Sequence, residues 1–336
     1  MTIIYISSER ERSGKTSFVT TLAKKLTTAG KKVTIIIPPD MNGSDTHVTG
    51  LMIKDLLSTV PENEFPKIRS DISLDSSGLT TIKSLAATND YDSSVCLIEE
   101  PSSQTTINPS DLLASLDAIC LDIVKFHAGI SHATILSRSQ ALGNRLAGVI
   151  INGVTRYKKA SVEFDLIPSF CSTGPSIFGA IPENRTLLSS TVKTLANNLN
   201  GRIITGEDHS DALVKHFMVG GWTLDSGELY FGIKEDKAAI IRGDRPDMQM
   251  SALNTNISCL ICTNGIEPIE YVLYEASQQD IPIVVVETDT LSTMKFLNEL
   301  KITSHFDHKV KLLEFEQLMD EWLDLDHMYN KLGISI

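Results

Sequence analysis

The residues best placed to do chemistry in this 336-residue chain lie close to its start. The run Ser-Gly-Lys-Thr-Ser at 13–17 follows an apolar run at 2–6 and leads into an amphipathic stretch at 17–29, so we expect a strand that turns into a helix. At such a turn, backbone N–H groups face phosphate oxygens, lysine pairs with the terminal phosphate and threonine ligates magnesium. The pattern predicts a phosphate site with Mg²⁺ and ATP or GTP, built from Ser13, Gly14, Lys15, Thr16 and Ser17.

The same loop departs from the usual phosphate-binding pattern. The glycine that ordinarily opens such a loop is replaced by Ser8 or Glu9, depending on whether five or four residues intervene. Glu9 and Glu11 put carboxylates where phosphate oxygens would approach, although neighbouring arginines offset their charge. A loop that merely closes the strand–helix turn is therefore the alternative interpretation.

Acidic and amide side chains follow two other apolar runs. Glu99 and Glu100 end the run at 95–98, which places a carboxylate beside the phosphate loop if the strands are parallel. Glu99 is thus both a predicted magnesium ligand, together with Thr16, and the candidate catalytic residue. Asn152 ends the run at 147–151, where its amide either reads a nucleotide base or starts an ordinary turn.

Apolar runs alternate with helical patterns along the first half of the chain. The strand-like runs are 2–6, 33–37, 95–98, 118–124, 147–151 and 176–180. Runs this apolar, with helices between them, indicate strands buried on both faces of a parallel α/β sheet. Within residues 41–92 we expect one helix, near 48–57, and otherwise loop.

A second alternating set follows a predicted helix at 190–199. Its expected strands are 202–205, 216–219, 238–242, 258–263 and 282–287, and its expected helices are 208–215, 224–231, 248–253, 268–278 and 290–300. An amphipathic helix at 315–329 closes the chain. We therefore predict two α/β domains, 1–200 and 201–336, with the closing helix in the second.

The composition excludes several classes of protein. With 42 acidic against 30 basic residues, a net charge of −12 disfavours binding to nucleic acid or to an anionic membrane. The N-terminal apolar run is too short for a signal peptide, and no stretch reaches the length of a membrane helix. The five cysteines are scattered, and Cys259 and Cys262 lie in a strand-like run. We expect core thiols and a cytoplasmic protein.

Four motifs in order carry a resemblance to a known family. They are residues 14–17, 98–101 (Ile-Glu-Glu-Pro), 147–154 (Ala-Gly-Val-Ile-Ile-Asn-Gly-Val) and 178–185 (Phe-Gly-Ala-Ile-Pro-Glu-Asn-Arg). Together they resemble the dethiobiotin-synthetase-like P-loop domain at the N-terminus of long bacterial phosphotransacetylases. Residues 217–222 and 242–247 resemble the DRTGG domain that follows it. The resemblance implies a small ligand near Asp244 and Arg245, a magnesium ligand at Asp45 or Asp40, and a homodimer.

The departures from that family shape the expected function. The acetyl-transferring domain would follow the DRTGG domain, beyond Ile336, so we do not expect phosphotransacetylase activity from this chain. The synthetases have a lysine where Ile37 precedes Pro38, and their Glu-Gly is Glu99-Glu100 here. Asp-Arg-Thr-Gly-Gly becomes Asp-Arg-Pro-Asp-Met at 244–248, where Asp244 as the N-cap of a helix is the alternative to a ligand contact.

Three functions follow from these expectations. The first is a regulatory nucleotide-binding protein, at most a slow ATPase or GTPase, linked to acyl-phosphate or central carbon metabolism. The second is a ligase that uses ATP to activate a carboxylate, as the synthetases do. The third is a scaffold that binds no nucleotide and partners a separate metabolic enzyme.

Overall fold

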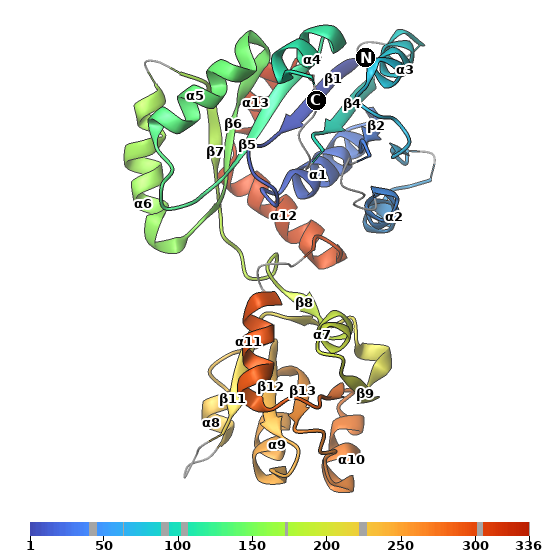
Figure 1. The fold of residues 1–336 in the computed structure, drawn as a ribbon, viewed down its shortest axis with the longest axis vertical. Coiled ribbons are helices and arrows are strands. Elements are labelled where there is room, and N and C mark those ends of the chain that lie inside the picture. Colours follow the sequence, from blue (N-terminus) through green and yellow to red (C-terminus); the bar gives the residue numbers. More distant parts are fainter. Residues whose placement is uncertain are drawn as a thin grey trace. The chain divides into compact units, whose positions relative to one another are not determined.

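The computed structural model describes residues 1–39, 46–62, 64–88, 94–101, 107–171, 174–221, 227–300 and 305–335 (Figure 1). The chain divides into two compact units. The first comprises residues 1–184 and 306–336, and the second comprises residues 185–305. The division differs from the predicted boundary at residue 200, and it places the C-terminal segment in the first unit instead of the second.

The first unit is built on a seven-stranded parallel sheet, as the apolar runs predicted. Its strand order is β3-β2-β4-β1-β5-β6-β7, which puts β1 at the centre between β4 and β5. All residues of β1 and β4 are buried, as expected of strands covered on both faces. The strands are β1 (Thr2–Ser7), β2 (Lys32–Ile36), β3 (Lys67–Arg69), β4 (Ser94–Glu99), β5 (Ile119–Lys125), β6 (Leu146–Val154) and β7 (Ile177–Pro182).

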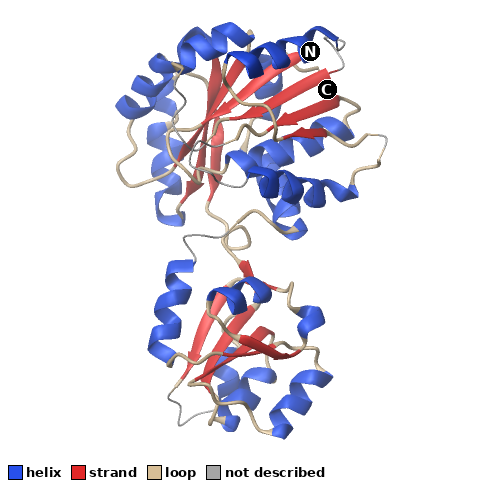
Figure 2. Cartoon of the chain, turned by 45° about the vertical axis from the view of Figure 1, so that its right-hand side comes forward, coloured by secondary structure: helices blue, strands red, loops and turns tan. Residues whose placement is uncertain are grey.

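Helices cover both faces of this sheet (Figure 2). They are α1 (Lys15–Thr28), α2 (Thr46–Leu56), α3 (Ser76–Thr88), α4 (Pro109–Leu116), α5 (His132–Leu142), α6 (Lys159–Ser161), α12 (Lys309–Trp322) and α13 (Leu325–Leu332). The prediction of one helix and otherwise loop at 41–92 was incomplete, because β3 and α3 also form there. The edge strand β3 alternates charged and apolar residues over three positions, which is too short a pattern to be recognised.

The C-terminal segment packs on the first unit, against α1 and β7. Lys24 and Lys25 of α1 form ion pairs of 2.6 Å with Glu316 and Asp320 of α12. The expected single helix at 315–329 is interrupted at Leu323, whose extended backbone forms a bridge to Gly179 of β7. A Cβ atom at Gly179 would collide with the Trp322 carbonyl oxygen, so this attachment requires glycine.

Removing residues 306–336 is expected to unfold the first unit. Among its buried residues are six large apolar side chains of α12 and α13, each contributing about 1.5–3 kcal/mol, so the loss is comparable with the whole stability of a domain. These side chains are Leu312, Phe315, Leu318, Met319, Met328 and Leu332. Thermal unfolding followed by circular dichroism would compare residues 1–305 with the full chain. A first-unit transition at the full-chain temperature would contradict the expectation.

The second unit has its own, mostly parallel sheet in the order β11-β12-β13-β14-β9, with β9 antiparallel to β14. A short antiparallel pair, β8 with β10, lies beside it. The strands are β8 (Ser190–Thr191), β9 (Arg202–Thr205), β10 (Leu213–Val214), β11 (His216–Gly220), β12 (Lys237–Arg242), β13 (Ile257–Thr263) and β14 (Ile283–Val285). The helices are α7 (Val192–Asn198), α8 (Gly227–Phe231), α9 (Pro246–Leu253), α10 (Glu270–Gln278) and α11 (Thr290–Leu300).

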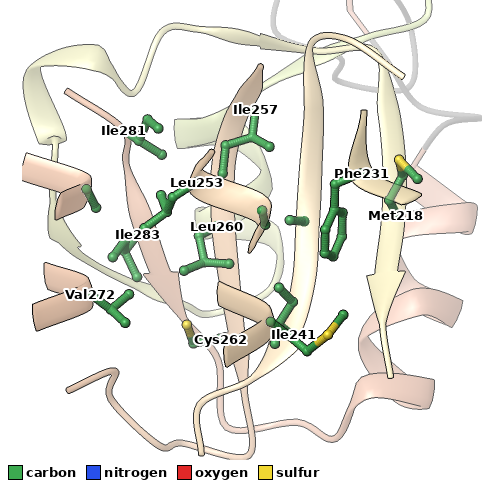
Figure 3. Packing of buried hydrophobic residues seen from close by; sticks show 14 of the residues in the cluster. Met218, Phe231, Ile241, Leu253, Ile257, Leu260, Cys262, Val272, Ile281 and Ile283 are labelled. Atoms are coloured by element: carbon green, nitrogen blue, oxygen red, sulfur yellow. The ribbon is translucent and has the colours of Figure 1, made fainter. Parts of the chain in front are cut away.

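One predicted helix of this unit, 208–215, was wrong. The structure has a 3-10 turn at Glu207–His209 and then β10, whose Leu213 and Val214 pair with β8. Asp208, Ser210 and Asp211 in this run favour turns over helices. Figure 3 shows one hydrophobic core of this unit, a cluster that includes Met218, Phe231, Ile241 and Leu260.

Four of the five cysteines are buried thiols, as expected. Cys259 and Cys262 belong to clusters on opposite faces of the second sheet. Burial raises the pKa of the Cys96 and Cys262 thiols to about 12, and also raises the pKa of Cys120 and Cys259. Among the described residues, no group of three or more His, Cys, Asp or Glu side chains is placed to hold a metal.

Brief iodoacetamide treatment of the native protein is therefore expected to label Cys171, the exposed cysteine, and to spare the four others. Peptide mass spectrometry gives the labelled fraction of each site. Full labelling after denaturation is the control, and rapid native labelling of Cys262 would contradict the buried arrangement.

The structure also bears on membrane insertion. Among the helices of the described residues, none combines the length and apolar character that crossing a bilayer requires.

Candidate functional site

The predicted loop forms the connection from β1 to α1. Gly14 is the N-cap of α1 with φ 97°, and Arg12 also has a positive φ of 54°, so the backbone turns sharply before the helix. A Cβ atom on Gly14 would overlap the side-chain amide of Asn152. Lys15 opens the helix and is 7% exposed. The structure thus brings residues 13–17 to one strand–turn–helix junction.

Thr16 and Glu99 meet beside this turn. The Thr16 hydroxyl donates to Glu99 Oε1 at 2.6 Å. Glu99 Oε2 and the Ser13 hydroxyl are buried, and neither has a partner among the described residues. Burial raises the pKa of Glu99, whereas the Thr16 hydrogen bond and the charge of Lys15 lower it. A carboxylate oxygen without a partner beside a threonine hydroxyl is an oxygen donor set that suits Mg²⁺.

The further predicted metal ligand is not placed. Asp45 and its alternative Asp40 both lie outside the described residues. Thr16 and Glu99 are therefore the predicted magnesium ligands that the structure brings together.

Asn152 lies at the same edge of the sheet, at the end of β6. Its Nδ2 donates to the Ser13 carbonyl oxygen at 2.7 Å. In this arrangement the amide holds the turn before Gly14. The base contact predicted for Asn152 stays a prediction, and its nitrogen would have to leave Ser13 to make one.

A network of charged side chains that lies at the start of the loop was not predicted from the sequence. Glu100 Oε2 accepts the backbone N–H of Ser8 at 2.6 Å and lies 3.8 Å from Arg138. Arg138 makes three hydrogen bonds of 2.9–3.0 Å to Asp122, which also accepts the Ser7 hydroxyl at 2.6 Å. The signal that could have found it is Asp122, a charged residue inside the buried strand β5.

The network connects the start of the loop to β4, β5 and α5. Burial raises the pKa of Glu100, while the Ser8 N–H, Lys15 and Arg138 oppose the shift and Asp122 adds to it. Burial and the charge of Glu100 together raise the pKa of Tyr5 in β1 well above its usual value. The Glu100 carboxylate thus fixes the backbone at Ser8, one of the two positions at which the usual loop has glycine.

A cavity of about 340 Å³ opens beyond the ends of β5 and β6, on the first unit. His132, the first residue of α5, stacks on Phe170 at 4.4 Å, and its Nε2 is buried with no partner among the described residues. One wall includes a π-helix, Val162–Leu166, a rare element that is frequent at functional sites. The lining residues are Phe126, Ala128, Ile130, His132, Lys158, Ser161, Val162, Asp165, Leu166 and Ser169.

The second predicted site lies on the turn from β12 to α9. Asp244 forms a bidentate pair with Arg242, and Arg245 with Asp247. Asp244 is not the N-cap of α9, since Arg245 occupies that position and Asp244 pairs with Arg242 instead. Pro246 opens the helix, a position at which its missing N–H costs no hydrogen bond. Both guanidinium groups at this exposed turn therefore already have an anionic partner.

Comparison with known families identifies the second unit. Residues 194–300 match the DRTGG domain. This segment is a DRTGG domain. It accounts for most of the second unit, and it confirms the resemblance that residues 217–222 and 242–247 indicated. The first unit has the predicted α/β fold, a parallel sheet whose first strand leads through the loop into α1.

Similarity to whole proteins is more distant. A phosphate acetyltransferase from Synechocystis sp. is 22% identical over 253 residues, which are 66% of this chain and 36% of that protein. The match thus spans little more than a third of the relative's length.

Two solved structures are similar in part. The CBS and DRTGG domains of the regulatory region of Clostridium perfringens pyrophosphatase, complexed with the activator diadenosine tetraphosphate, are 19% identical, with a TM-score of 0.30. That alignment covers 35% of this chain and 51% of the other. The MinC:MinD cell division protein complex of Aquifex aeolicus is 15% identical, with a TM-score of 0.37, over 56% of this chain and 84% of that one.

Proposed function

We propose that the protein is a regulatory nucleotide-binding protein whose first unit binds ATP or GTP with Mg²⁺. The observation that carries the proposal is the buried Lys15 at the start of α1, beside Glu99 with its unpartnered Oε2. Lys15 would pair with the terminal phosphate, and Thr16 and Glu99 would hold the metal, which neutralises phosphate charge. Arg12 has a left-handed backbone conformation. The backbone N–H groups of the turn that follows it would face the remaining phosphate oxygens.

Any hydrolysis is expected to be slow. Ser8 or Glu9 stands in place of the glycine that would let the backbone wrap the phosphates, and Glu100 adds a buried carboxylate close to Lys15. Glu99 is the candidate to orient a metal-bound water. Further parts of the proposal are a small ligand near Arg245 of the DRTGG domain, a homodimer, a cytoplasmic location, and a separate enzyme of acyl-phosphate metabolism as partner.

A thermal-shift titration tests this function directly. A ligand at one hundred times its Kd stabilises the folded state by about 2.7 kcal/mol, so Mg-ATP or Mg-GTP should raise the melting temperature, whereas Mg²⁺ with inorganic phosphate should raise it less. No shift with any nucleotide at millimolar concentration would contradict the proposal and favour the scaffold.

A second candidate function, ATP-dependent activation of a carboxylate, is favoured by the cavity lined by His132. It opens at the carboxyl ends of β5 and β6, the sheet edge that also carries the P-loop. In that reaction a substrate carboxylate oxygen attacks the terminal phosphorus of ATP and ADP leaves. Phosphate release stimulated by added carboxylic acids, and reduced by His132→Ala, would support it; release indifferent to every acid would oppose it.

A further inference from the structure

Glu100 presents an internal anion to the phosphate loop. Its Oε2 accepts the Ser8 N–H at 2.6 Å, and its side chain is 15% exposed. Lys15 and Arg138 are the cations close enough to act on its charge. A carboxylate in this position competes with a phosphate for the same positive charge.

The charges around the loop do not favour a bare phosphate ligand. Arg138 is committed to Asp122 by three hydrogen bonds and lies 3.8 Å from Glu100. Lys15 therefore compensates the charge of both Glu99 and Glu100. Each of these carboxylates weakens the attraction between Lys15 and a bound phosphate. Because these groups are largely buried, solvent and salt screen them weakly.

Resting on the nucleotide-binding function above, we propose that Glu100 is a specificity-determining residue, which makes the loop accept nucleotide as its magnesium complex and reject metal-free nucleotide. The metal brings two positive charges that compensate Glu99 and Glu100 together. Without the metal, the triphosphate meets the Glu99 and Glu100 carboxylates, and Lys15 is the buried cation beside them.

Isothermal titration calorimetry with ATP in excess Mg²⁺, and with ATP in EDTA, gives the two dissociation constants and their ratio. In Glu100→Gln the side-chain carbonyl can still accept the Ser8 N–H while the charge is lost. We expect the affinity for metal-free ATP to rise about tenfold, and that for Mg-ATP to change by less than about threefold. Glu62→Gln removes an equal but exposed charge and should leave both constants unchanged.

Glu100→Asp separates charge from shape, because it keeps the carboxylate and shortens the side chain. This variant should keep the wild-type ratio of the dissociation constants for metal-free ATP and Mg-ATP, even if its shorter side chain no longer accepts the Ser8 N–H. If Glu100→Gln leaves the ratio of the two dissociation constants unchanged, for example by binding Mg-ATP and metal-free ATP equally more tightly, the inference is overturned while nucleotide binding stays intact. Failure of the wild type to bind Mg-ATP would instead remove the proposed function, and this inference with it.

Discussion

Replacing Lys15 with alanine is expected to abolish most of the stabilisation that Mg-nucleotide gives the protein. The ammonium is the cation at the start of α1 and is largely buried, so a phosphate paired with it would be weakly screened. A hydrogen bond to a charged group contributes roughly 1.5–3 kcal/mol, which corresponds to about a 10- to 100-fold loss of affinity. The measurement is the nucleotide-induced shift in melting temperature, relative to the ligand-free midpoint of each variant.

Lys83→Ala is the matched control for this substitution. Lys83 lies on α3 of the same unit and is exposed, so its loss should leave the nucleotide response at the wild-type level. An undiminished response in Lys15→Ala would show that nucleotide binds elsewhere, and would remove Lys15 from the site.

Replacing Gly14 with alanine is expected to destabilise the first unit and disable the loop. Gly14 has φ 97°, a conformation that costs other residues about 1–2 kcal/mol, and the new Cβ would overlap the Asn152 amide. Relieving that overlap displaces Asn152 from the Ser13 carbonyl. We therefore expect the free energy of unfolding, measured by chemical denaturation, to fall by roughly 2–4 kcal/mol. We also expect the nucleotide-induced shift in melting temperature to disappear.

Gly30→Ala is the control that isolates the overlap. Gly30 follows α1 with φ 80°, yet no atom lies within 4 Å of the place that its new Cβ would take, so this variant bears the backbone cost alone. The difference in unfolding free energy between the two variants measures the clash with Asn152. Equal losses would contradict the contact, and a double-mutant cycle with Asn152→Ala should show strong coupling.

The sequence was most informative where chemistry and periodicity coincide. Short, mostly apolar runs predicted six of the seven strands in the first sheet, because a strand buried on both faces is built largely from apolar residues. The loop at 13–17 could be placed for a related reason: a strand, a glycine and a helix must follow in order. The edge strand β3 gave no such signal, because an exposed edge tolerates Lys67 and Arg69.

What the sequence could not indicate are contacts between distant positions. The closing helix was expected in the second domain because it follows that domain in the chain, whereas its buried face fits α1 and β7. Arg138 looks like any surface arginine of a polar helix until Asp122 is found beside it. Asn152 was interpreted through its own strand, and its actual partner is 139 positions away at Ser13.

The return of residues 306–336 to the first unit has a consequence for biosynthesis. The second unit is an insertion, so the ribosome must complete residues 185–305 before the last helices of the first unit exist. At about 5–20 residues per second, the nascent first unit waits on the order of ten seconds without them. The DRTGG domain can fold as a continuous piece as soon as it is complete, whereas throughout that interval the apolar surface awaiting α12 is open to chaperones.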